Sequence, residues 1–154
     1  MAVEPGRVLG IDAGERRIGV AISDPGGSFA LPLDSIPADG SELDRLAELV
    51  QREGVTALVV GLPLSLSGEA SAQTERARTF ASRVEQRLGL PVHMWDERLS
   101  SHEAERLTSG EREGRGRERG RRGARRQPSG ADTDALAASI ILQAYLDSLR
   151  RRTF

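Results

Sequence analysis

Short apolar runs alternate with amphipathic stretches along most of the chain, and this pattern predicts its secondary structure. The apolar runs at 7–12 and 18–24 are separated by a short turn containing Gly14, which predicts two antiparallel β-strands. A third strand is expected at 29–36. Pro32 favours an edge position for it, because proline cannot donate a hydrogen bond within a sheet.

Helical and strand patterns then alternate. We expect Ser41 to cap a first helix, with Asp44 in support, and Gly54 to end it. The apolar run at 55–60 predicts a strand that is covered on both faces. Residues 70–88 then predict a surface helix, since apolar side chains recur on one side only.

The remaining pattern predicts one more strand and two helices. The strand is expected at 91–95, with Asp96 and Glu97 at its end. Ser100 and Glu103 form a capping-box pair that predicts a short helix. A last helix is expected at 132–150, with a buried stripe formed by Leu136, Ala137, Ile140, Ile141, Ala144 and Tyr145.

A hairpin followed by βαβ units predicts an α/β fold with a mixed five-stranded sheet and helices on both faces. The 154 residues fit a single domain, 1–154. Right-handed crossovers bring the later strands beside the first, so their carboxyl ends meet at one edge of the sheet. Asp12 and Glu97 both end such strands, and we expect their side chains to approach each other.

Composition changes this picture at one segment. The net charge is −1, yet residues 112–126 contain eight arginines and two glutamates, and lysine is absent from the chain. The Arg/Gly-rich stretch at about 110–130 shows no periodicity and predicts a mobile loop, either a solvated linker or a segment that neutralises phosphates. The candidate phosphate contacts in this loop are Arg115, Arg117, Arg119, Arg121, Arg122, Arg125 and Arg126.

The rest of the composition indicates where in the cell the protein is found. The chain has no cysteine and no apolar run long enough to cross a bilayer. These features predict a cytoplasmic protein with no membrane partner.

Carboxylates supply the candidate chemistry. Asp12 and Glu97 at adjacent strand ends, with Asp134 from the start of the last helix, would form an all-oxygen site for Mg²⁺ or Mn²⁺. A pair of such ions supports hydrolysis of phosphodiester bonds. Each acid also has a simpler interpretation, since Asp12 could close the turn and Asp134 could face the helix dipole. Glu97 could form a surface ion pair with Arg98 or Arg16.

Four motifs extend this interpretation: 9–14 with 17–21, 59–64 with Gly68, 96–100, and 134–138 with 141–142. In this order, and over most of the chain, they resemble the YqgF (RuvX-like) nuclease family. The resemblance implies an RNase H-like fold and a divalent-metal nuclease site. It also implies either resolution of Holliday junctions or maturation of the 5′ end of pre-16S ribosomal RNA.

Position by position, the acidic site of that family matches Asp12, Glu97 and Asp134. The resemblance therefore implies that these three residues are catalytic and bind the metal. Arg98 matches the motif as well and could contact phosphate. The basic segment is longer here than is usual in the family, and Asp132 adds an acid beside Asp134. Which of these two aspartates reaches the metal therefore stays open.

The leading hypothesis is a metal-dependent endonuclease on structured nucleic acid, processing pre-16S ribosomal RNA in ribosome biogenesis. Its alternatives are a Holliday junction resolvase in DNA recombination and a non-catalytic RNA-binding assembly factor. A phosphotransferase of the actin and sugar-kinase type also uses an Asp-x-Gly turn, but it would need two domains. The sequence leaves open whether the protein is a monomer or a homodimer.

Overall fold

A five-stranded sheet in the order β3-β2-β1-β4-β5 forms the centre of the molecule. This computed structural model describes residues 6–65, 67–99 and 130–152, and the predicted Ser100–Glu103 helix and the Arg/Gly loop lie outside these ranges. β1 pairs antiparallel with β2 and parallel with β4, as the hairpin and the crossovers predict. The strands are β1 (Arg7–Ala13), β2 (Arg17–Ser23), β3 (Ala30–Pro37), β4 (Val55–Leu62) and β5 (Val92–Asp96).

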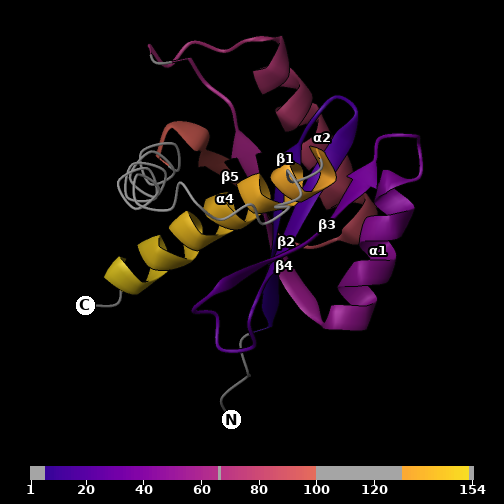
Figure 1. Cartoon of the computed structure of the whole chain (residues 1–154), viewed down its shortest axis with the longest axis vertical. Helices are drawn as coiled ribbons and strands as arrows, with labels where there is room; N and C mark the ends of the chain where they lie inside the picture. Colours follow the sequence, from indigo (N-terminus) through magenta and orange to yellow (C-terminus); the bar gives the residue numbers. More distant parts are fainter. Residues whose placement is uncertain (1–5, 66, 100–129, 153–154) are drawn as a thin grey trace, which may run out of the picture.

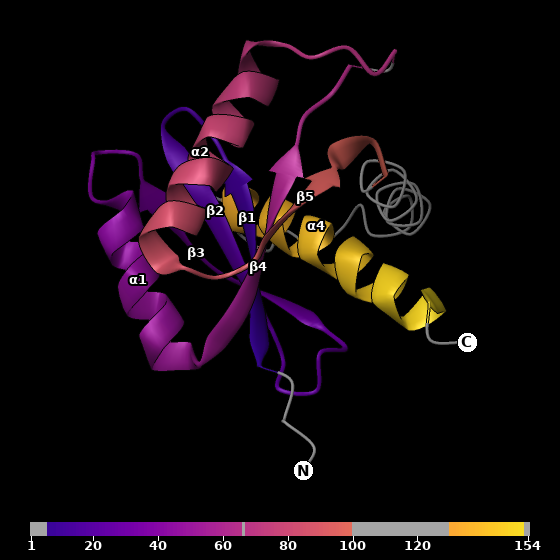
Figure 2. The ribbon, with the colours of Figure 1, turned by 180° about the vertical axis from the view of Figure 1, so that it is seen from behind.

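Helices cover both faces of this sheet, which confirms the predicted layers (Figures 1 and 2). α1 (Glu42–Glu53) and α2 (Ala72–Leu88) pack on one face, where Leu46 and Val84 join a core with side chains of β1, β2 and β4. α4 (Gly130–Arg152) crosses the opposite face and forms a second, smaller core. β3 lies at the edge of the sheet, as its proline predicts.

The helix ends show where local sequence decides structure. Ser71 caps α2 through a capping box with Thr74, and the left-handed Gly89 ends the helix. Ser41 precedes α1 but forms no side-chain cap, so that prediction is wrong. The hydroxyl has other partners, since it accepts a hydrogen bond from Nε of Arg45 at 3.0 Å and donates one to the Asp39 carboxylate at 2.5 Å. Asp44 likewise forms an ion pair with Arg87 of α2.

α4 lies close to the sheet because small residues face each other. A Cβ atom on Gly10 would lie 2.6 Å from the Cβ of Leu142, and one on Gly19 would lie 1.9 Å from the carbonyl oxygen of Asp134. The predicted buried stripe is wrong at Leu136, whose surface is 54% exposed. The helix is rotated instead, so that Ala135, Ala138, Ile141, Leu142 and Leu146 are buried. Within the described residues, no helix has the length and apolar character that a membrane span requires.

Candidate active site

Asp12 lies near the carboxyl end of β1, the central strand, in a gap between glycines. Across the ladder it pairs with Gly19 of β2. On the other side, Gly61 of β4 follows Val60, the partner of Ile11. Because side chains alternate along a strand, Asp12 shares the α4 face with Gly10. The missing side chains make room for the side chain of Glu97 over Gly61 and for the backbone of α4 over Gly19.

Glu97 follows β5 directly and its side chain lies over Gly61. A Cβ atom on Gly61 would lie 2.6 Å from the Oε1 of Glu97, so only glycine leaves room for this arrangement. The carboxyl groups of Glu97 and Asp12 share a hydrogen bond. The parallel strands therefore bring together the two acids that the sequence pattern predicts, and Asp12 does more than close a turn.

The two acids share a proton in the absence of a cation. Burial raises the pKa of Glu97 to about 7, and the negative charge of Asp12 and the hydrogen bond between the two groups add to this shift. Burial also raises the pKa of Asp12, while the hydrogen bond from Glu97 opposes that rise and the charge of Asp134 adds to it. Without a compensating positive charge, the two carboxylates do not both ionise until the pH rises past the raised pKa of Glu97.

Asp134, on the N-terminal part of α4, lies close enough to raise the pKa of Asp12 by its charge. Its carboxylate accepts a hydrogen bond from Nε of Arg17 at 2.9 Å, an ion pair that joins α4 to the start of β2. Among the described side chains, no group of three His, Cys, Asp or Glu residues is arranged to hold a metal ion. The Asp132 side chain lies outside the described side chains.

Arg98 is held by its own neighbour. Its Nη2 lies 2.6 Å from Oδ2 of Asp96, its Nε donates to both oxygens of that carboxylate, and its backbone N–H donates to Oδ1. This fork orients the guanidinium beside Gly68 in the loop between β4 and α2. Of the two arginines offered as simple ion-pair partners for Glu97, Arg98 pairs instead with Asp96, and Glu97 shares a hydrogen bond with Asp12.

A hollow of about 200 Å³ opens beside the two carboxylates, and its wall includes residues that sequence reasoning missed. Asp12 and Glu97 line one side, while Gln73 and Arg76 of α2 line the other. Arg76 forms an ion pair with Glu15 at 3.0 Å, which bridges α2 and the β1–β2 turn. The sequence does contain a signal for these two residues, because Gln73 and Arg76 are three positions apart and therefore lie on one side of α2.

Known proteins match this chain over nearly its whole length. Residues 6–148 match the family model described as "RuvX: Holliday junction resolvase". A protein of Pelotomaculum thermopropionicum is 42% identical over 148 residues, covering 94% of this chain and 89% of its own. One from a Roseiflexus species is 40% identical over 152 residues, covering 97% and 100%. Both are named "Putative pre-16S rRNA nuclease".

Solved structures support the fold. Thermus thermophilus RuvC, in complex with a Holliday junction substrate, aligns with a TM-score of 0.58 and 18% identity over 93% of this chain and 96% of its own. Another Thermus thermophilus RuvC structure gives a TM-score of 0.56 at 17% identity, covering 94% and 96% of the two chains. The sheet and its two helical layers are therefore of the RNase H-like type.

Proposed function

The chain belongs to the RuvX family, and on that premise we propose that it is a divalent-metal-dependent endonuclease that processes the 5′ end of pre-16S ribosomal RNA. The names of its relatives, which are about 40% identical, support the substrate. The observation that carries the chemistry is the hydrogen-bonded pair of Asp12 and Glu97 at the carboxyl ends of parallel strands. Carboxylates in this position are typical of phosphodiesterase sites that use Mg²⁺ or Mn²⁺.

The donor set fits a divalent cation. Burial and the charge of Asp12 raise the pKa of Glu97, a bound cation would offset both effects, and oxygen ligands suit Mg²⁺ and Mn²⁺. Asp12 and Glu97 would hold the ion, and Asp134 would join them by exchanging its contact with Arg17. When bound, such an ion activates water and stabilises charge on the phosphate. Binding would release the proton that the pair shares, because both carboxylates must then be ionised.

The arginines have a separate role in the proposal. We place Arg98 at the phosphate next to the scissile bond. Its guanidinium is already held by Asp96, so it would lose little entropy on binding a phosphate. The arginines at 115–126 would neutralise more distant phosphates and give a steep dependence of affinity on salt. Phosphate contacts of this kind hold a strand without reading its sequence.

An Asp12→Asn variant tests the assignment. It keeps the size of the side chain but removes the charge, so we expect cleavage of a pre-16S RNA fragment in Mg²⁺ or Mn²⁺ to be abolished while the fold is kept. Asp44→Asn is the matched control, since Asp44 is exposed and pairs with Arg87 far from the site. An Asp12→Asn protein that still cuts would refute the metal site.

A four-way DNA junction offered in parallel tests the second candidate, which the description of the matching family model favours. Cleavage of the junction with no cleavage of the RNA would make the protein a resolvase. Binding of either substrate without any cleavage by the wild-type protein would instead favour a non-catalytic assembly factor.

A further inference from the structure

We propose that a trough along α2 holds the phosphate backbone of the substrate strand on one side of the scissile bond, with Arg76 and Arg83 as its phosphate contacts. This trough is formed by Ala13, Gly14, Glu15, Gln73, Arg76, Thr79, Phe80 and Arg83. The proposal rests on the proposed nuclease function, because it deepens the description of how that site holds its substrate.

Two adjacent hollows form the trough. The hollow of about 200 Å³ that contains Asp12 and Glu97 shares Ala13, Gly14, Glu15 and Arg76 with a second hollow of about 290 Å³. The second hollow continues along α2, on the face of the sheet opposite to α4. Because the two hollows share the residues of the β1–β2 turn, a strand whose phosphate lies at the two carboxylates can continue past this turn into the second hollow.

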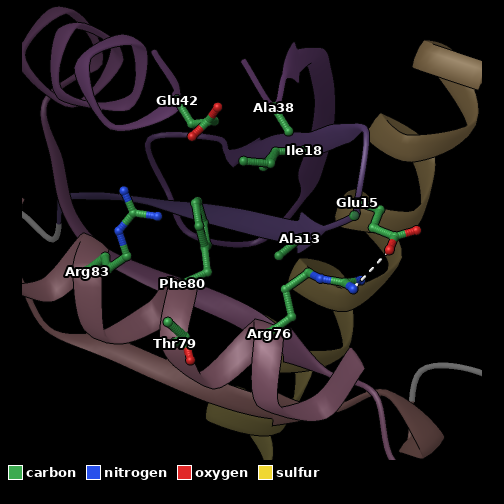
Figure 3. A pocket seen from close by; sticks show the side chains of 10 residues that line it. Ala13, Glu15, Ile18, Ala38, Glu42, Arg76, Thr79, Phe80 and Arg83 are labelled. Atoms are coloured by element: carbon green, nitrogen blue, oxygen red, sulfur yellow. Dashed lines mark hydrogen bonds and ion pairs between the residues drawn. The ribbon is translucent and has the colours of Figure 1, made fainter. Parts of the chain in front are cut away.

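The spacing along α2 suits a repeating anion. Gln73, Arg76, Phe80 and Arg83 recur every three or four residues, so they lie on one side of the helix. Figure 3 shows Arg76 and Arg83 rising from α2 on either side of Phe80. Seven residues of helix span roughly 10 Å, so Arg76 and Arg83 stand far enough apart to contact two different phosphates of one strand.

The existing partners of these arginines are weak enough to be exchanged. The side chains of Arg76 and Glu15 are 40% and 75% exposed, and an ion pair so open to water adds little stability. Arg83 is exposed and forms no ion pair with any described residue. Glu42, which lines the same hollow as Arg83, is buried and accepts a hydrogen bond from the backbone N–H of Gly40.

Two other arginines of α2 provide a contrast. Arg78 pairs with Glu75 in the same helix, and Arg87 pairs with Asp44 of α1. Neither lines the trough. The double substitution R78Q/R87Q therefore removes the same charge from the same helix as R76Q/R83Q, but away from the proposed strand path.

Binding by the full chain, each variant carrying Asp12→Asn to prevent cutting, tests the proposal. The probes are a fluorescein-labelled single-stranded RNA of about 20 nucleotides and a DNA of the same sequence, measured by anisotropy between 50 and 200 mM KCl. R76Q/R83Q should lose roughly tenfold or more in affinity and reduce the slope of log affinity against log salt by about 1.4, or ~0.7 per contact. RNA and DNA should respond alike, because the contacts are to phosphate.

The control decides the outcome. R78Q/R87Q should leave affinity and slope close to those of the parent, and thermal denaturation should show all four proteins folded. If wild-type protein cuts RNA while R76Q/R83Q binds like R78Q/R87Q, the trough is refuted and the nuclease assignment stands. If R76Q/R83Q loses binding but wild-type protein cuts neither nucleic acid, the trough is supported and the nuclease function fails.

Discussion

Replacing Gly19 by alanine tests the contact that places Asp134 near Asp12. The added Cβ atom would lie 1.9 Å from the carbonyl oxygen of Asp134 and 2.3 Å from its carbonyl carbon. These atoms belong to the backbone of α4, so no side-chain rotation relieves the clash and the N-terminal part of the helix must move. Overpacking of this kind costs about 1–3 kcal/mol in free energy of unfolding. For a chain of this size, that range corresponds to a fall in Tm of roughly 3–10 °C.

The readouts are thermal denaturation and metal-dependent cleavage. We expect Gly19→Ala to lower Tm. Because it also displaces Asp134, it should reduce cleavage even at temperatures where the variant is fully folded. Gly26→Ala is the control, because its nearest contact would be the Asp24 carboxylate at 3.4 Å. A Gly19→Ala protein with the stability and activity of wild type would show that α4 does not pack on β2 as described.

Two further predictions concern the acids and the capping of α2. The fold raises the pKa of Glu97 from 4.5 to about 7, so between these values the unfolded chain releases a proton that the folded protein keeps. The stability of the metal-free protein should therefore fall as pH rises from about 4.5 to 7, which is measured as a falling Tm. In Glu97→Gln the Tm should depend less on pH over this range. An unchanged dependence would contradict the shared proton. Ser71→Ala removes the capping hydroxyl of α2 and should cost about 1 kcal/mol in urea denaturation. Ser41→Ala, at a helix start without a side-chain cap, is its control and should cost measurably less, so equal losses would argue against the cap.

The layers and strand order were predictable from the sequence because they depend on patterns that one residue cannot overturn. Pro32 favours an edge position for β3, and the apolar run 57–60 within β4 favours helices on both faces. Asp12 and Glu97 then meet because parallel strands share an edge of the sheet. Their hydrogen bond follows from this topology.

Contacts that depend on competition between nearby groups were not predictable. Ser41 has a suitable neighbour in sequence for capping, yet its hydroxyl accepts from Nε of Arg45 and donates to Asp39 instead. Arg98 could reach two acids, and the adjacent Asp96 binds it in a fork. Arg17 reaches Asp134 only because Gly19 allows α4 to approach β2. Each outcome is decided by small differences in distance, which sequence periodicity does not resolve.

The position of β1 also has a consequence for biosynthesis. β1 is made early and lies in the middle of the finished sheet, whereas β5 and α4, which bring Glu97 and Asp134, are made much later. Because chains are synthesised from the N-terminus, a growing chain can form the β1–β2 hairpin while the α4 face is still bare. An unfinished chain therefore lacks the side chains of Glu97 and Asp134, and the proposed acidic centre cannot form before α4 is made.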